Sequence, residues 1–209
     1  MNVLIFGASG GTGRELAEQA VAHGHMVTAF VRRPEKFTIH HANIKIHQGD
    51  VSDRASVESA LQGQDAAISA LGGASLFKRE PAFVVGIHNI VSSMERASIR
   101  RFIYLSADTV RNARNKFNAL RKLLIALIFS KTAADHELNE GMIRQSHLDW
   151  IIVRPPMLTN GRRTGVYRTG EHLKADSVIP KLSRADLADF MLNQLRENTF
   201  LYKMPEVMY

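Results

Sequence analysis

The chain has 209 residues, of which 45% are hydrophobic and 22% charged, and its 27 Lys and Arg against 20 Asp and Glu give a formal net charge of +7. This composition is typical of a globular domain and excludes disordered, collagen-like and bare coiled-coil proteins. The chain contains no cysteine, which excludes disulfide scaffolds, thiolate metal sites and cysteine nucleophiles and fits a cytoplasmic protein. The positive charge predicts attraction to anionic partners such as a phosphorylated small molecule.

Strand and helix signals alternate over most of the chain. An apolar strand over 2–6 precedes a helix over 13–23, whose Leu16, Ala17, Ala20 and Val21 have helical spacing. Repeated βα units of this length predict an α/β fold, a Rossmann-type doubly wound parallel sheet with helices on both faces. The further strands are expected over 26–31, 44–47, 66–70, 101–105 and 149–153, and the further helices over about 53–61, 81–94, 116–146 and 183–195.

The C-terminal part has a looser pattern, with turn signals at 159–161 and 164–165. Because no linker or internal repeat is present, we expect a single domain over 1–209, with about 157–209 forming a small C-terminal cap on the sheet. The apolar run 123–129 is too short to span a bilayer. We expect it to be a buried helix rather than a membrane-surface one, and the N-terminus does not read as a secretory signal.

The strongest local signal is the glycine turn between the first strand and the first helix. Gly7 permits the sharp turn, Gly10 allows backbone N–H groups to approach a pyrophosphate, and Gly13 allows the helix to pack closely on the sheet. A hydrolase nucleophile elbow, Gly-x-Ser-x-Gly, also fits residues 7–11, but it normally follows several strands. A purely structural turn is the third interpretation, and the strand–turn–helix context favours the dinucleotide site.

Basic residues follow the second strand, where an acidic residue would favour NAD. Arg32, with Arg33 or Lys36 as a second contact, instead favours the 2′-phosphate of NADP(H), because a guanidinium binds phosphate through two hydrogen bonds. The alternative is a solvated turn with incidental positive charge. The sequence therefore predicts NADP(H) as the cofactor.

Several motifs together resemble the atypical short-chain dehydrogenase/reductases, in particular the NmrA-like NAD(P)H-binding proteins and the family of biliverdin-IXβ and flavin reductases. The similarity runs almost end to end. Besides the glycine turn, it rests on Gly49-Asp50-Val51, Gly63-Gln64-Asp65-Ala66, Leu71-Gly72-Gly73, His88-Asn89-Ile90-Val91, Leu105-Ser106-Ala107, Asp135-His136, Pro155-Pro156 and Ser183-Arg184-Ala185-Asp186-Leu187.

The resemblance implies a set of cofactor-binding residues at the carboxyl ends of the strands. Asp50 and Val51 would border the adenine, whereas Ser106 and Ala107 would lie beneath the nicotinamide. Each has a structural alternative, such as an aspartate that braces its own loop. The complete set is Gly7, Ser9, Gly10, Gly11, Thr12, Gly13, Arg32, Arg33, Lys36, Asp50, Val51, Leu71, Gly72, Gly73, Ser106, Ala107, Pro155, Pro156 and Met157.

The chain departs from its relatives in two ways that bear on catalysis. None of its tyrosines has a lysine four residues later, so the Tyr-x-x-x-Lys pair that protonates a carbonyl oxygen is missing. Met157 stands where biliverdin-IXβ reductases have a histidine. The catalytic candidates are Ser106, His136 as a proton donor or a helix-surface residue, and Lys131 as an alternative ribose contact.

Other functions lack matching motifs. The histidines have no metal-ligand spacing, so no metal is predicted, and scattered arginines without a DNA- or RNA-binding motif make nucleic acid an unlikely partner. We expect an NADPH-dependent reductase that transfers hydride to a small conjugated acceptor, such as a flavin, quinone or tetrapyrrole. The alternative is a non-catalytic NADPH-binding redox sensor or regulator, and the oligomeric state is open.

Overall fold

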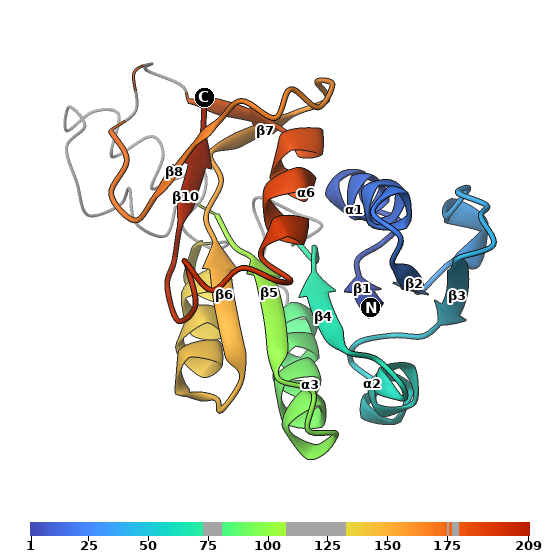
Figure 1. The fold of residues 1–209 in the computed structure, drawn as a ribbon. Helices are drawn as coiled ribbons and strands as arrows, with labels where there is room; N and C mark the ends of the chain where they lie inside the picture. Colours follow the sequence, from blue (N-terminus) through green and yellow to red (C-terminus); the bar gives the residue numbers. More distant parts are fainter. Residues whose placement is uncertain (73–80, 108–132, 175, 177–179) are drawn as a thin grey trace.

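The computed structural model describes residues 1–72, 81–107, 133–174, 176 and 180–209. Within this part of the chain, six parallel strands form the central sheet in the order β3-β2-β1-β4-β5-β6, with helices on both faces (Figure 1). This is a doubly wound dinucleotide-binding order, so the predicted fold class is confirmed. The strands are β1 Asn2–Phe6, β2 Met26–Val31, β3 Ile44–Gln48, β4 Ala66–Ser69, β5 Arg101–Leu105 and β6 Asp149–Val153.

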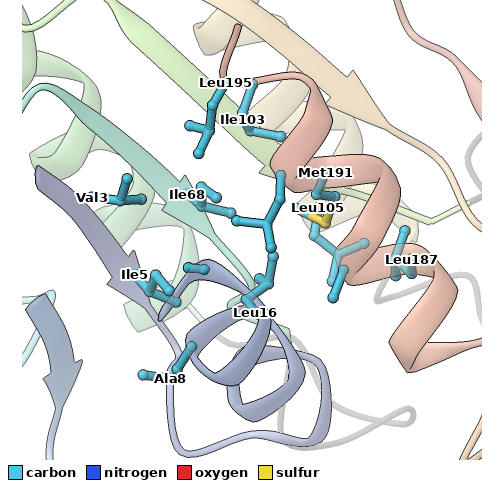
Figure 2. Close-up of a cluster of buried hydrophobic side chains, with 14 of the residues drawn as sticks. Val3, Ile5, Ala8, Leu16, Ile68, Ile103, Leu105, Leu187, Met191 and Leu195 are labelled. Carbon is cyan, nitrogen blue, oxygen red and sulfur yellow. The ribbon is translucent and has the colours of Figure 1, made fainter. Parts of the chain in front are cut away.

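One face of the sheet is covered by α1 (Gly11–Ala22) and α6 (Arg184–Asn193), which pack against each other. Side chains at alternate positions of the strands point toward these helices, because a strand turns successive residues to opposite faces. Figure 2 shows Ile5 of β1 and Ile103 of β5 beside Leu16 and Met191 of the two helices. The last helix of the chain is therefore built into the same core as the first.

The opposite face is covered by α2 (Arg54–Leu61), α3 (Pro81–Arg96) and the helical residues 133–145. The intervening strand positions, such as Leu4 and Phe6, belong to this second core. Burial on both faces explains why the strands are almost continuously apolar instead of alternating.

The predicted elements agree closely with the structure through β6. Helix α1 begins two residues before the expected start, because the Arg14 N–H already donates to the Gly10 carbonyl at 2.9 Å. Asp53 caps α2 by accepting from the Ala55 N–H at 3.0 Å. Of the helix expected over 116–146, residues 133–145 are helical, whereas the apolar run 123–129 lies outside the described residues.

Short elements that the sequence did not predict complete the C-terminal part. Each of four strands has three residues, too few for a periodic signal. Strand β7 (Met157–Thr159) pairs with β9 (Lys181–Ser183) in parallel, and β8 (Arg168–Gly170) pairs with β10 (Glu206–Met208) in antiparallel orientation. The short helix η1 (Pro34–Lys36) follows β2.

Among the described residues, no helix is long and apolar enough to cross a membrane.

Candidate functional site

The site lies at the carboxyl ends of the strands, between β1 and β4, where the strand order of the sheet reverses direction. The connection from β1 leads to β2 on one side, and β4 pairs with β1 on the other. Open parallel sheets bind ligands at such a switch point, because the loops diverge there and leave a crevice. Two cavities with common walls occupy this position.

Steric contacts with the backbone explain why two positions of this turn, Gly7 and Gly13, are glycine. Gly7 has φ +78°, and a Cβ there would lie 2.9 Å from the Ala70 carbonyl carbon. A Cβ on Gly13 would lie 2.1 Å from the Gly7 oxygen. The turn is closed by the Gly10 N–H, which donates to Gly7 at 3.0 Å. Any side chain at Gly7 or Gly13 would therefore separate α1 from the sheet.

The N-terminus of α1 borders both cavities through Gly10, and the second cavity also through Gly11. Gly10 is the N-cap and makes no side-chain capping hydrogen bond, and the first turn contains no acidic residue. The first N–H groups of a helix have no partner within the helix and carry part of its positive dipole. They fit a pyrophosphate, as the sequence predicted for this turn.

The first cavity, of about 290 Å³, extends from the glycine turn to the end of β2. Three exposed cations, Arg32, Arg33 and Lys36, lie on its wall. They give this end a local positive charge that suits a phosphate. The other lining residues are Gly7, Ser9, Gly10, Phe30, Val31, Asp50, Val51, Ser52, Ala70, Leu71, Gly72, Ala82 and Phe83.

Asp50 lines this cavity and also braces its own loop. Its Oδ1 accepts from the Ser52 N–H at 2.9 Å and from the Ser52 hydroxyl at 2.8 Å. These hydrogen bonds lower the pKa of Asp50, and the charge of Arg32 lowers it further. Helix α3 holds the same loop, because Asn89 donates to the Val51 carbonyl at 2.9 Å. The structural role expected as an alternative for Asp50 is therefore present.

The second cavity, of about 250 Å³, lies between the glycine turn and the ends of β5 and β6. It shares Gly10, Ala70, Leu71 and Gly72 with the first cavity, so one extended ligand can follow both. Its other lining residues are Gly11, Thr12, Leu105, Ser106, Ala107, His136, Pro155, Pro156, Leu158 and Arg184.

A buried group of polar side chains lies behind the second cavity. The Nδ1 atom of His136 is 2.8 Å from the hydroxyl of Tyr104, which also accepts from Asn139 at 3.2 Å. Burial lowers the pKa of His136 to about 4, against the opposing effect of Glu140 and Asp135. Burial also raises the pKa of Tyr104 above its usual range. His136 is therefore a neutral, enclosed imidazole at pH 7 and not the surface residue expected as the alternative.

Ser106 belongs to a second buried chain of hydrogen bonds. Its hydroxyl donates to Glu140 at 2.6 Å, and the Nε of Arg154 donates to the same carboxylate at 2.9 Å. The Glu140 and Arg154 side chains are only 5% and 12% exposed. This ion pair fixes the carboxylate against the end of β5.

Most predicted cofactor residues meet in the two cavities, with two exceptions. Gly13 acts through packing and does not line the cavities. Met157 begins β7, is 51% exposed, and does not line either cavity. Gly73 and Lys131 lie outside the described residues.

Several residues at the site were not predicted from the sequence. The side chain of Arg184 lines the second cavity and approaches the N-terminus of α1, since a Cβ on Gly11 would lie 2.8 Å from its Nε. Its Nη1 donates to Asn160 at 2.6 Å. The available signal for Arg184 was its place in the motif Ser183-Arg184-Ala185-Asp186-Leu187, whereas Glu140 and Arg154 gave none.

Comparison with known proteins identifies the family. The NAD(P)H-binding family model matches residues 7–198, a range that includes the glycine turn, both cavities and α6. The chain belongs to the NAD(P)H-binding family. The cofactor is thus NAD(P)H, and the glycine turn lies between the first strand and the first helix, where dinucleotide-binding folds place the pyrophosphate.

The relatives of this NAD(P)H-binding protein include dehydrogenases and reductases. A 3 beta-hydroxysteroid dehydrogenase/Delta 5-->4-isomerase of Mycobacterium tuberculosis is 32% identical over 119 residues, which are 52% of this chain and 32% of that protein. The chain thus spans about a third of the length of the first curated relatives that it matches.

Solved structures share the whole fold. An anaerobillin reductase from Escherichia coli O157:H7 has a TM-score of 0.80 at 23% identity, over 99% of this chain and 96% of that one. A short-chain dehydrogenase/reductase from Veillonella parvula, solved with NADP, has a TM-score of 0.81 at 18% identity, over 99% and 93% of the chains. Both structures therefore share the Rossmann-type fold of this chain, the fold class that the sequence predicted.

Proposed function

We propose that this protein is an NADPH-dependent reductase that acts on a flat conjugated acceptor, such as a flavin, quinone or tetrapyrrole. The observation that carries the proposal is the continuity of the two cavities, with cations at one end and Ser106 and His136 at the other. When bound, the nicotinamide supplies a hydride. The same-fold anaerobillin reductase supports a reductase of this kind.

The basic end of the first cavity selects the cofactor. Arg32, Arg33 and Lys36 line it, and a guanidinium pairs with a phosphate more strongly than with a ribose hydroxyl. We infer that these residues bind the 2′-phosphate and so favour NADPH over NADH. The glycine turn would hold the pyrophosphate at the N-terminus of α1.

The second cavity favours an acceptor that needs no strong acid from the protein. Tyr104 is fully buried, and burial lowers the pKa of His136 to about 4. Neither group therefore resembles the tyrosine acid of the Tyr-x-x-x-Lys enzymes. A conjugated acceptor spreads its negative charge over the ring system and can take a proton from solvent, so positioning is the main contribution of the protein.

The test is anaerobic oxidation of NADPH, and separately of NADH, with FMN, riboflavin, a simple quinone or biliverdin as acceptor. We expect turnover with NADPH preferred. NADPH deuterated at one or the other face of C4 should give a primary isotope effect from one face only, because a nicotinamide bound in one orientation transfers hydride from a single face. Tight NADPH binding without turnover of these acceptors would contradict the proposal and favour a redox sensor or regulator.

A further inference from the structure

The hydroxyl of Ser106 has its only proton committed to a buried carboxylate. The Oγ atom lies 2.6 Å from Oε1 of Glu140. A carboxylate accepts hydrogen bonds but has none to donate, so the proton in this contact comes from Ser106. The two lone pairs of the hydroxyl remain, and Ser106 lines the second cavity. A ligand that reaches this oxygen therefore meets an acceptor.

The ion pair with Arg154 keeps this polarity fixed. Arg154 donates to both carboxylate oxygens of Glu140, through Nε at 2.9 Å and through Nη2. Both side chains are nearly enclosed, and breaking such a pair would leave an uncompensated buried charge. Arg154 therefore holds the carboxylate of Glu140 in place, and the hydroxyl of Ser106 cannot turn its proton to the cavity without losing a charge-assisted hydrogen bond.

The imidazole of His136 has the opposite polarity. Asn139 donates to the Tyr104 hydroxyl, which leaves the proton of this hydroxyl available for Nδ1 of His136. In the tautomer that accepts this proton at Nδ1, the neutral imidazole carries its own proton on Nε2. Because His136 also lines the second cavity, the described walls of this cavity combine a hydrogen-bond acceptor, Ser106, with a donor, His136.

We propose that Ser106 is a specificity-determining residue that accepts a hydrogen bond from an amide-type N–H group of the bound ligand, and that Glu140 is the residue that positions it. The proposal rests on the proposed reductase function. An N–H group beside a carbonyl is present in the pyrimidine ring of flavins, in the lactam rings of open-chain tetrapyrroles and in the carboxamide of nicotinamide. Simple quinones carry carbonyl oxygens but no N–H group, so they match Ser106 poorly.

The test compares ligands that differ only in this N–H group. Lumiflavin and 3-methyllumiflavin differ at the acceptor, and NADPH and its reduced 3-acetylpyridine analogue differ at the carboxamide. Flavin binding is measured by fluorescence quenching with the protein saturated with NADP⁺, and binding of the reduced dinucleotides is titrated separately. These measurements do not need turnover, so a failure of the proposed reductase activity would not obscure them.

In the wild type we expect the ligand with the N–H group to bind roughly 3- to 10-fold more tightly, the range of one net hydrogen bond. Ser106→Ala should abolish this preference. Loss in the flavin pair identifies the acceptor as the source of the N–H group, and loss in the dinucleotide pair identifies the cofactor. If neither pair shows a preference that depends on Ser106, the proposal is wrong.

Two further variants separate positioning from structure. Glu140→Ala removes the oxygen that accepts the serine proton, so the hydroxyl can turn this proton to the cavity, and the preference for the ligand with the N–H group should be lost although the serine is still present. Thermal unfolding checks that this variant folds. Ser69→Ala is the matched control, because the Ser69 hydroxyl is buried without a hydrogen-bond partner and lines neither cavity. It should keep the wild-type preference.

Discussion

Gly13 packs directly on Gly7 at the start of α1, so closely that a Cβ on Gly13 would lie 2.1 Å from the Gly7 carbonyl oxygen. The atoms in the way belong to the backbone of the glycine turn and cannot move independently of it. The same contact sets the distance between the α1 N-terminus and the sheet, and thus the width of the crevice.

Gly13→Ala is therefore expected to lower the free energy of unfolding by about 2–3 kcal/mol, as in overpacked cores, and to weaken NADPH binding. Urea unfolding and a cofactor titration measure the two effects. The matched control is Gly141→Ala, within the helical residues 133–145, where a Cβ would meet no atom within 4 Å. This control should be neutral or stabilising by up to about 1 kcal/mol, and equal destabilisation by both variants would contradict the steric explanation.

Arg32 is expected to determine the preference for NADPH over NADH. Arg32→Ala should weaken NADPH binding by roughly 1.5–3 kcal/mol, the range for a hydrogen bond to a charged group, and leave NADH binding nearly unchanged. Arg96→Ala is a suitable control, because Arg96 pairs with Glu58 at 3.3 Å and lines neither cavity. Equal losses for the two cofactors would show that Arg32 does not bind the 2′-phosphate.

Local sequence signals were sufficient to predict the central sheet and the glycine turn. The runs that became β2 and β5 are apolar, and the glycine spacing at 7, 10 and 13 has a direct steric meaning in the structure. The cations after β2 are similarly local, because they follow a strand whose carboxyl end faces the crevice. Signals of this kind need only one strand and the turn that follows it.

The polar network behind the second cavity could not be predicted in the same way. Glu140, Arg154 and Ser106 are separated by 14 and 34 positions, and no spacing rule brings them together. His136 was expected as a possible surface residue because polar helix faces usually point to solvent. In the structure, His136, Asn139 and Glu140 form the buried side of their helix, since Tyr104 and Ser106 offer them hydrogen bonds.

Burial of His136 should make stability depend on pH in a defined window. The pKa of this ring is lowered from 6.5 to about 4, so the unfolded chain binds a proton at pH values where the folded protein does not. Stability is then complete above pH 6.5 and falls as the pH is lowered from 6.5 toward 4, by up to about 3 kcal/mol. The carboxylates with lowered pKa, such as Asp149, lose their contribution at still lower pH.

Urea unfolding at pH 7.5 and pH 5.0 checks this prediction. His136→Asn should reduce the difference between the two pH values by about 2 kcal/mol. Burial also lowers the pKa of His25. His25→Asn should therefore remove only the contribution of His25 to the pH dependence of the unfolding free energy and leave the contribution of His136 intact. An unchanged pH dependence in His136→Asn would mean that this ring takes up its proton at the same pH in both states.

Asp186 is expected to be the main polar anchor of the C-terminal part. Its fully buried carboxylate accepts from the Thr164 and Gly165 N–H groups at 2.7 and 2.8 Å and from the Tyr209 hydroxyl at 2.7 Å. Burial raises the pKa of Asp186, but these hydrogen bonds outweigh it and bring the pKa below its usual value. One carboxylate thus joins α6 to the loop before β8 and to the chain end.

Asp186→Asn replaces an acceptor oxygen with an amide that faces N–H and O–H donors. We expect a loss of about 2–4 kcal/mol in the free energy of unfolding, since hydrogen bonds to a charged group are lost and buried donors are left unpaired. Tyr209→Phe removes only one of the contacts to this carboxylate and should cost about 1 kcal/mol. Asp186 lines neither cavity, so the folded fraction of Asp186→Asn should bind NADPH as the wild type does, and a specific loss of cofactor affinity would assign Asp186 to the site instead.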